Sequence, residues 1–424
     1  MNKCKVTNLS SERKQLKNSR KNLTERVFVE QIMRTNTLTM PRRIIFGKDS
    51  AKNVGEEAKA LGATRVLLVT DGGVLNSGIL TCVQENLSSK ELQVQVFSDV
   101  EPEPDISTAD RVAEVVRKER FDLVCGVGGV SVLDVAKIAS VMSTNPGPVR
   151  EYVGVNLVKK PGLPKILLPT TAGTGSEMTP NAIFGLHDEG IKAGVVSPYV
   201  LADVAIVDPS LTLTLPAKPT AISGIDALTH AIESYISVDA NPITDLFSLR
   251  AIELIARNLP TAYSKGTNLP ARAAMSLASM LAGISIANAG TCSGHAAAYG
   301  FAATHRIPHG FSVGVALPYI MEFSLVSCPL KGRAIAQAMG EDTSRRTPSG
   351  SNKRAVQAVL RLMKRIKCPT SLSQLGITRS EIENIAQEML KTKRLLVHNP
   401  RAVNDHDALE IITRMWEGKI NPRS

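Results

Sequence analysis

The sequence predicts two structural parts, an α/β domain with a parallel sheet followed by an all-helical domain. Short apolar runs alternate with helical patterns between residues 37 and 212, which is typical of βαβ units. Beyond residue 213 the patterns are helical, and strand-like runs are almost absent. The length of 424 residues is enough for two domains that each bury a core.

The first 36 residues form a basic leader. Residues 1–40 hold nine Lys or Arg against three Glu, so they carry more than half of the net charge of +11. The leader is rich in Ser and Asn and lacks an apolar period, so we predict a disordered tail or an upstream start codon, with a transit peptide as the less favoured alternative. Because the rest of the chain carries a small net charge, we expect no nucleic-acid partner.

Cysteine usage and one uncharged stretch indicate the cellular setting. The six cysteines form no C-x-x-C pair, which argues against a disulfide framework or a zinc knuckle and favours a reducing, cytoplasmic compartment. Residues 273–304 contain no Asp, Glu, Lys or Arg, but they are rich in Ala, Gly and Ser. We therefore predict tightly packed core helices there and no membrane span.

Individual elements can be placed within this outline. Residues 107–120 fit an amphipathic helix, and Leu211–Pro216 marks the boundary between the two parts. The polar stretch 340–354 is predicted to be a surface loop. Strand candidates are the apolar runs at 65–70, 93–97, 121–125, 165–168 and 204–207.

Turns with the composition of a nucleotide site follow three of these strands. Gly126–Ser131 leads into a helical run, where backbone N–H groups at the helix N-terminus suit a diphosphate, although glycine pairs are common at such turns. The hydroxyl-rich turn 169–177 suits a cofactor groove or an ordinary turn. Asp71, which follows the first strand, suits hydrogen bonds from an adenosine ribose or the capping of the next turn.

The helical half contains four side chains that fit one divalent ion. Asp226 and His230 are four residues apart in a helical pattern, so they project from one helix face. Alone, this spacing also fits an exposed Asp–His pair. His295 and His309 flank a segment of small residues, and one Asp with three His is a donor set suited to Fe(II), Zn(II) or a related ion.

From about residue 37 onward these motifs together resemble the iron-containing (group III) alcohol dehydrogenases. The matching motifs are GVGGVSVLDVAK (126–137), PTTAGTGSEMT (169–179), DPSLTLTLP (208–216), GIDALTHAIESY (224–235) and HAAAYGFAATHRIPHG (295–310). The resemblance implies a Rossmann-like dinucleotide-binding domain over 37–212 and a helical, metal-binding catalytic domain over 213–424. Dehydroquinate synthase shares this architecture.

The resemblance also implies roles for particular residues. The implied metal ligands are Asp226, His230, His295 and His309. The implied cofactor contacts are Asp71, Gly128, Gly129, Val130, Ser131, Thr170, Thr171, Thr174, Thr179 and Lys192. NAD is favoured over NADP, because the carboxylate at position 71 would repel a 2′-phosphate.

Two positions depart from the family pattern. Val130 replaces the third glycine of the usual diphosphate turn, and its Cβ is expected to crowd the phosphates. Tyr299 stands where many members carry a second His, so a proton relay would fall to Tyr299 or to His305. Tyr299 also keeps open an alternative, a hydroxyacid–oxoacid transhydrogenase with retained NAD(H).

The function implied by the resemblance is that of a metal-dependent, NAD(P)-linked alcohol dehydrogenase. The metal, Fe(II) or Zn(II), would hold the substrate oxygen, and a hydride would pass reversibly between a small alcohol or hydroxy acid and NAD. A small-molecule substrate and a second copy of the chain, in a homo-oligomer, are the expected partners. Neither nucleic acid nor a membrane is expected.

Overall fold

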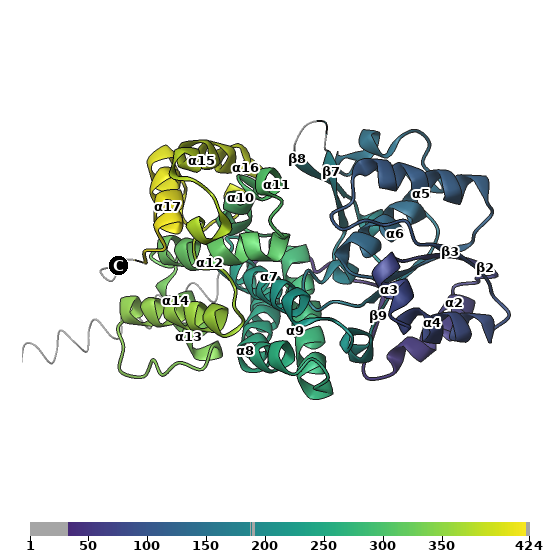
Figure 1. Cartoon of the computed structure of the whole chain (residues 1–424), viewed down its shortest axis with the longest axis horizontal. Coiled ribbons are helices and arrows are strands. Elements are labelled where there is room, and N and C mark those ends of the chain that lie inside the picture. The colour runs from purple at the N-terminus through teal and green to yellow at the C-terminus, as the bar shows by residue number, and fades with distance from the viewer. Residues whose placement is uncertain (1–32, 187, 189–190, 421–424) are drawn as a thin grey trace, which may run out of the picture.

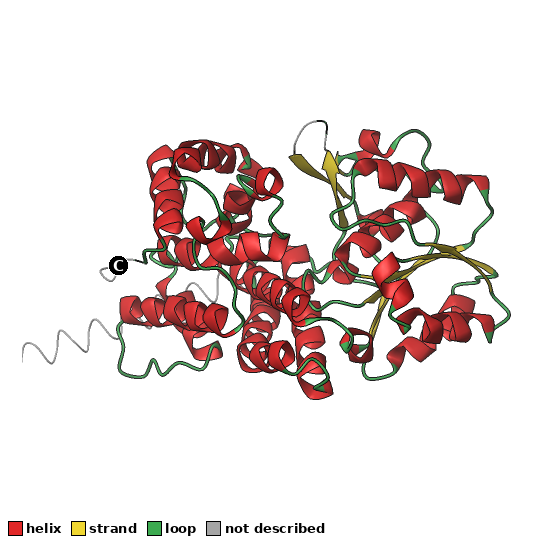
Figure 2. Cartoon of the chain, in the orientation of Figure 1, coloured by secondary structure: helices red, strands yellow, loops and turns green. Residues whose placement is uncertain are grey.

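The structure is a computed structural model, and it describes residues 33–186, 188 and 191–420. Residues 1–32 of the predicted leader lie outside the described residues. The strands gather in one half of the molecule and the helices that follow residue 217 gather in the other (Figure 1, Figure 2). This arrangement confirms the predicted fold class.

A six-stranded parallel sheet organises the first half, in the order β1-β9-β6-β4-β2-β3. From β2 the chain moves outward to β3, and it then returns to β4 and continues the other way to β6 and β9. Such a reversal opens a crevice at the carboxyl ends of the strands. The strands are β1 (Arg43–Phe46), β2 (Arg65–Val69), β3 (Gln93–Phe97), β4 (Leu123–Gly128), β6 (Lys165–Pro169) and β9 (Val204–Val207).

Helices cover both faces of this sheet. Alternate residues of β2 point to opposite faces, so Val66 and Leu68 enter one apolar core while Leu67 and Val69 enter the other. The first core is completed by α2 (Val54–Ala60) and α4 (Ile79–Ser88), and the second by α5 (Ile106–Lys118) and α6 (Val130–Met142). The short helix α3 (Gly72–Asn76) follows β2 directly.

A second sheet of three strands packs beside α6. Its strands are β5 (Gly154–Val155), β7 (Asn181–Leu186) and β8 (Ile191–Val196), and β7 pairs antiparallel with β8. The sequence-based prediction did not include these strands or β1. Strands β1 and β5 have only four and two residues, and β7 and β8 are interrupted by Gly, Ala, Asn or Lys, which have low strand propensity.

The second half is helical throughout its described residues. Helices α7 and α12 are buried on almost every side, so their sequences show no amphipathic stripe. The helices are α7 (Ala217–Ile236), α8 (Pro242–Ser264), α9 (Leu269–Ala289), α10 (Ser293–Tyr299), α11 (Ala302–His305), α12 (His309–Ser324), α13 (Pro329–Ala338), α14 (Pro348–Arg365), α15 (Ile382–Lys391), α16 (Lys393–Leu396) and α17 (Asp405–Glu417).

The prediction of a surface loop over 340–354 is wrong for the second half of that stretch. Helix α14 already begins at Pro348, and the Thr347 side chain accepts a hydrogen bond from the Gly350 N–H at its N-terminus. Proline at the first helical position and a threonine cap are both favourable helix starts. Proline is common in loops as well as in the first turn of a helix, and here Pro348 begins α14.

Helix α9 joins the two halves. Its residues Met280 and Ile284 pack against Met178, Ala205 and Val207 of the sheet half. Within the described part of the chain, α9 is the one helix long and apolar enough to cross a membrane, and 67% of its apolar stretch is buried inside the protein. The burial marks α9 as a core helix at the junction of the two halves.

Candidate active site

Four side chains that we expected to bind a metal come together beside the crevice of the sheet. Asp226 and His230 lie on α7 and His295 lies on α10, and their ligand atoms are all within 4.8 Å of one another. His309 is the first residue of α12, with its Nε2 3.9 Å from Asp226 Oδ1. The cluster therefore joins three helices that are separated in the sequence.

The contacts inside the cluster fit a bound cation. His230 Nε2 and His295 Nε2 face each other at 3.0 Å, and His230 Nε2 lies 3.8 Å from Asp226 Oδ1. Asp226 Oδ1 is buried and has no hydrogen-bond partner among the described residues. A buried carboxylate oxygen without a donor is costly unless positive charge compensates it. One carboxylate and three imidazoles supply suitable ligands for a divalent transition metal.

Burial favours the protonation states that bind metals. It lowers the pKa of His230 to about 4 and that of His309 to about 3, although Asp226 opposes the shift in both cases. For Asp226, burial alone would raise the pKa, but the neighbouring histidines and a hydrogen bond from Thr174 outweigh it and leave the pKa lowered. Near neutral pH, His230 and His309 are therefore neutral imidazoles and Asp226 is a carboxylate, the forms that bind a metal.

Glu233 orients one of the imidazoles. This residue lies on α7 with its side chain fully buried, and its Oε2 is 2.5 Å from His295 Nδ1. A carboxylate on Nδ1 fixes the ring so that Nε2 faces the cluster. Glu233 is not among the site residues that the sequence predicted. Its position, seven residues after Asp226 and three after His230, was a usable signal because it places all three on one helix face.

A cavity of about 520 Å³ connects this cluster to the carboxyl ends of the central strands. Its walls include residues from the turns after β2, β4 and β6 and from the helical half: Asp71, Gly129, Val130, Ser131, Thr171, Thr174, Asp226 and His309. An adjoining cavity of about 130 Å³ is bounded by Val130, Ser131, Thr174, Lys192, Tyr299 and His309. The expected cofactor and metal regions thus open into one continuous space.

Asp71 and Val130 line the larger cavity at the N-termini of α3 and α6. Asp71 Oδ1 accepts hydrogen bonds from the N–H groups of Gly73 and Val74 at 2.8 and 2.9 Å, so Asp71 caps α3 while also lining the cavity. Val130 is the first residue of α6, with helical backbone and a side chain that is 38% exposed. The helical backbone explains how a residue other than glycine is accommodated at this position.

Three of the expected cofactor contacts, Gly128, Thr170 and Thr179, do not line either cavity. Gly128 ends β4, where a Cβ would lie 2.5 Å from the Val132 side chain. Thr170 and Thr179 are 5% and 2% exposed, and neither borders the two cavities. Thr179 Oγ1 instead contacts Lys137 Nζ at 3.3 Å. These residues support the loops that form the site.

Tyr299 and His305, the two residues considered for a proton relay, differ in their position relative to the cavities. Tyr299 lines the smaller cavity, and its ring stacks on that of His309 with centroids 6.3 Å apart. His305 has both ring nitrogens engaged, Nε2 by Glu381 at 2.9 Å and Nδ1 by the Phe301 carbonyl at 3.2 Å, and it borders neither cavity. Of the two residues, Tyr299 therefore borders the candidate site, whereas the ring of His305 is held by Glu381 and Phe301.

Lys192 and His309 both line the smaller cavity. Lys192 sits on β8, and its Nζ forms an ion pair with Glu103 Oε2 at 3.0 Å. The Lys192 side chain is 16% exposed and lines the cavity beside Tyr299. A positive charge therefore stands at the edge of the space between the two halves.

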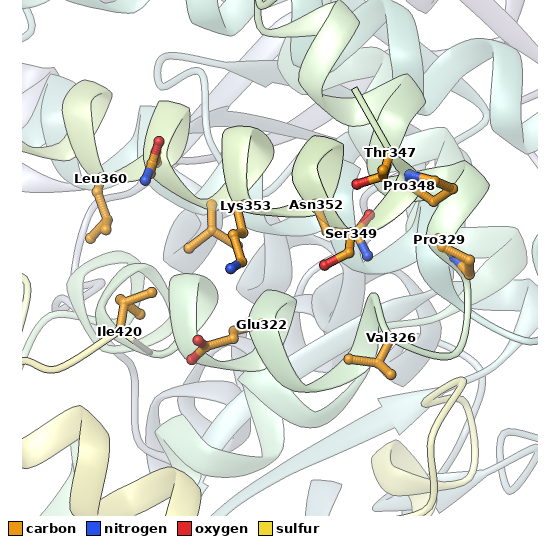
Figure 3. A pocket seen from close by; sticks show the side chains of 12 residues that line it. Glu322, Val326, Pro329, Thr347, Pro348, Ser349, Asn352, Lys353, Leu360 and Ile420 are labelled. Atoms are coloured by element: carbon orange, nitrogen blue, oxygen red, sulfur yellow. The ribbon is translucent and has the colours of Figure 1, made fainter. Parts of the chain in front are cut away.

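A separate apolar cavity of about 680 Å³ lies between α12 and α14 (Figure 3). Val326, Val356 and Leu360 contribute to its walls. Its carboxylate, Glu322, forms an ion pair with Arg414. Because the lining holds no cluster of titratable or metal-binding groups, we assign it no part in the chemistry.

Comparison with known proteins places this geometry in a family. Residues 41–209 match the family model described as iron-containing alcohol dehydrogenase, and residues 220–416 match the model for the C-terminal part of the Fe-containing alcohol dehydrogenase family. Long-chain-alcohol dehydrogenase 1 of Geobacillus thermodenitrificans (strain NG80-2) is 39% identical over 367 residues, which cover 86% of this chain and 92% of the relative.

Solved structures agree with the sequence matches. A crystal structure of 1,3-propanediol oxidoreductase aligns with a TM-score of 0.88 and 35% identity, over 90% of this chain and 100% of the other. Sulfoacetaldehyde reductase from Bifidobacterium kashiwanohense, in complex with NAD⁺, aligns with a TM-score of 0.81 and 30% identity, over 90% of this chain and 99% of the other. Both halves of the molecule are covered, and the chain belongs to the iron-containing alcohol dehydrogenase family of oxidoreductases.

Proposed function

We propose that the protein is a metal-dependent, NAD-linked alcohol dehydrogenase that interconverts a small alcohol, or a hydroxy acid, and its carbonyl product. The observation that carries this proposal is the opening of the Asp226–His230–His295–His309 cluster into the cavity at the strand ends. A reacting carbon held beside the cluster could then approach a nicotinamide bound in the same cavity.

The four clustered residues would hold the metal, and Fe(II) and Zn(II) both suit this donor set. When bound, such an ion supplies Lewis acidity to the substrate oxygen. Glu233 keeps His295 aimed at the cluster, and Thr174 Oγ1 hydrogen-bonds Asp226 Oδ2 at 3.1 Å. These contacts orient the Asp226 carboxylate and the His295 ring.

NAD would lie across the crevice of the sheet. The N-terminus of α6, at Val130 and Ser131, borders the cavity and suits the diphosphate because helix N-termini present unpaired N–H groups. Asp71 at the end of β2 suits the adenosine ribose and disfavours a 2′-phosphate. The nicotinamide would then point toward Lys192 and His309, whose side chains line the smaller cavity.

Tyr299 would form a hydrogen bond within the substrate pocket. Burial raises the pKa of Tyr299, and Arg394 opposes the shift through its charge and a hydrogen bond. The hydroxyl therefore stays protonated near neutral pH, and it suits orienting the substrate oxygen better than removing its proton. Proton release to solvent would use the open side of the cavity.

The test is NADH formation by metal-stripped protein reconstituted with Fe(II) or Zn(II), assayed with short alcohols, diols and hydroxy acids. We expect turnover that requires metal, that disappears in His295→Ala and that survives in His406→Ala, a control at an exposed histidine of α17. Turnover without metal, or unchanged turnover in His295→Ala, would refute the assigned site.

We also propose a reducing compartment and a homo-oligomeric state. The described cysteines are all free thiols, which supports the first proposal. The oligomeric state rests on the family resemblance, and light scattering on the purified chain measures it directly. A monomeric mass at micromolar concentration would refute that part.

A further inference from the structure

Lys137 is a buried lysine that the proposed reaction does not use. It lies in α6 with 0% of its surface exposed, and it borders neither cavity of the site. Burial lowers the pKa of its ammonium group, and the charge of Asp134 counteracts that shift. A buried cation is costly unless hydrogen bonds and an opposite charge surround it. The hydrogen-bond partners of Lys137 therefore indicate which segments its side chain anchors.

Those partners come from three different elements. Lys137 Nζ lies 3.2 Å from Asp134 Oδ1 in α6, 2.6 Å from Ser176 Oγ and 2.7 Å from the Asn181 carbonyl at the start of β7. Asp134 adds to the same junction, because its Oδ1 accepts a hydrogen bond from Ser176 Oγ at 2.6 Å and its Oδ2 accepts one from the Ile183 N–H at 2.9 Å. Two charged residues of α6 thus hold the loop that contains Ser176.

The opposite side of this loop packs against α9. Gly175 has a φ of 65°, and a Cβ there would lie 2.6 Å from the Ser279 carbonyl and 2.7 Å from Gly283 Cα. Ser279 Oγ donates a hydrogen bond to the Gly173 carbonyl at 3.1 Å. The left-handed backbone and the close approach both require glycine at position 175. Loop 173–176 is therefore clamped between α6 of the sheet half and α9 of the helical half.

This clamped loop carries Thr174, whose hydroxyl donates a hydrogen bond to Asp226 Oδ2 at 3.1 Å. Asp226 Oδ1 receives no such bond and faces the histidines. The position of Thr174 thus decides which carboxylate oxygen is available to a metal. Ser176 is only two residues from Thr174, so its anchor also constrains Thr174.

We propose that Lys137 is a positioning residue that sets the geometry of the metal site from inside the cofactor-binding helix, by anchoring Ser176 and through it the Thr174–Asp226 hydrogen bond. The inference rests on the metal site proposed above. It assigns a role in metal retention to a residue that touches neither metal, cofactor nor substrate. It also links the N-terminus of α6, where the diphosphate would bind, to the ligand Asp226.

The chain contains a matched control for the loss of a buried lysine. Lys165 begins β6 with 4% of its surface exposed, and its Nζ lies 3.5 Å from Asp203 Oδ2. It occupies the amino end of the strand, away from the turn that leads to Thr174. A general loss of stability should follow from either substitution, Lys137→Met or Lys165→Met, whereas a change in metal geometry should follow only from the first.

The experiment titrates the metal-free full chain with Co(II) and records its d–d absorption spectrum. The dissociation constant comes from competition with a chromophoric chelator. We expect Lys137→Met to raise the dissociation constant about tenfold and to shift the spectrum, since changes behind a ligand typically cost about 10- to 100-fold in metal affinity. Thr174→Val should cause a larger loss, and Lys165→Met should leave affinity and spectrum unchanged.

The arms of the experiment separate the possible failures. Absence of Co(II) binding by the wild-type chain would refute the metal site itself. Binding by the wild type with the same affinity and spectrum in Lys137→Met would overturn the positioning role alone. If Lys137→Met does not fold, the Ser176→Ala variant tests the proposal instead, because it removes only the hydroxyl that Lys137 contacts. An unchanged Co(II) spectrum in Ser176→Ala would overturn the proposal. In the double variant Lys137→Met/Thr174→Val, the two losses should be less than additive.

Discussion

Asp226 and Glu233 both lie buried on α7, yet their oxygens meet different partners. The oxygens of Glu233 accept hydrogen bonds from the backbone N–H groups of Cys292 and Gly294, and one of them also contacts the His295 ring. Asp226 keeps one oxygen without a donor. At the scale of residues, the number of donors around each carboxylate separates the metal ligand from the residue that orients a ligand.

Substitution Glu233→Gln tests this distinction. The amide keeps the shape of the side chain but no longer supplies a negative charge to His295 Nδ1, so we expect metal affinity to fall about 10- to 100-fold. The measurement is Zn(II) affinity by chelator competition. Glu322→Gln is the matched control, because Glu322 is another buried carboxylate, paired with Arg414 outside the site. Equal losses in both variants would contradict the orienting role.

The two functions of Asp71 can also be separated. Asp71→Asn should retain the cap on α3, because asparagine is a good N-cap, while removing the charge that would repel a 2′-phosphate. We therefore expect kcat/KM for NADP to rise relative to NAD with little change in thermal stability. Asp71→Ala should show the same cofactor shift together with a loss of about 1 kcal/mol in stability. An unchanged NADP/NAD ratio in both variants would refute a ribose contact by Asp71.

At the scale of elements, α6 and the loop after β6 each have more than one role. The N-terminus of α6 borders the cavity, while Asp134 and Lys137 farther along the helix anchor the loop. The loop includes Glu177, which is 2% exposed. Burial raises the pKa of Glu177 to about 7, although its own backbone N–H and the charge of Lys137 oppose the shift. This element therefore contains a carboxyl group that is easier to bury protonated than ionised.

A pH dependence of stability follows from Glu177. Its pKa in the folded chain, about 7, lies above the ordinary value of 4.5, so the folded state binds this proton more tightly than the unfolded state. The contribution of Glu177 to the free energy of unfolding should be greatest when the pH is below its ordinary pKa of 4.5. This contribution should fall as the pH rises toward 7, by at most about 3 kcal/mol. Urea unfolding of the wild type and Glu177→Gln measures the difference. If the difference in unfolding free energy between the wild type and Glu177→Gln stays constant from about pH 5 to about pH 8, this assignment is contradicted.

At the scale of the whole molecule, the site lies where the two halves meet. The sheet half contributes the strand-end turns and the helical half contributes α7, α10 and α12 (Figure 1). Packing of α9 against β9 and the turn at Met178 keeps the halves together. A metal held by three helices would therefore stabilise the fold of the helical half as well as support the chemistry.

Metal removal should lower the thermal stability of the chain. With Zn(II) at a hundredfold excess over its dissociation constant, the expected stabilisation is about 3 kcal/mol, and it should grow with the metal concentration. Calorimetry of the metal-free and Zn(II)-loaded protein measures it. Asp226→Ala should show no Zn(II)-dependent rise in Tm, and an equal rise in that variant would mean that Zn(II) binds elsewhere.

Much of the fold was predictable because the relevant signals are local. The strands β2, β4, β6 and β9 are mostly apolar runs, and β3 alternates polar and apolar residues. The Asp226–His230 pair lies about one turn apart on a helix. His295 and His309 were added as candidates because they flank a segment of small residues, and the motif resemblance implied the same four ligands. Strands β1, β7 and β8 escaped prediction because their identity comes from the neighbours they pair with.

The sequence by itself thus determined the two-part organisation, the strands of the central sheet other than β1, the family and the candidate metal ligands. Only the tertiary structure decided that Glu233 orients His295, that His305 faces Glu381, and that Lys137 reaches Ser176. Those contacts join residues 62, 76 and 39 positions apart. Spacing along a helix or strand predicts neighbours a few residues away, whereas contacts over such separations arise only when whole elements pack.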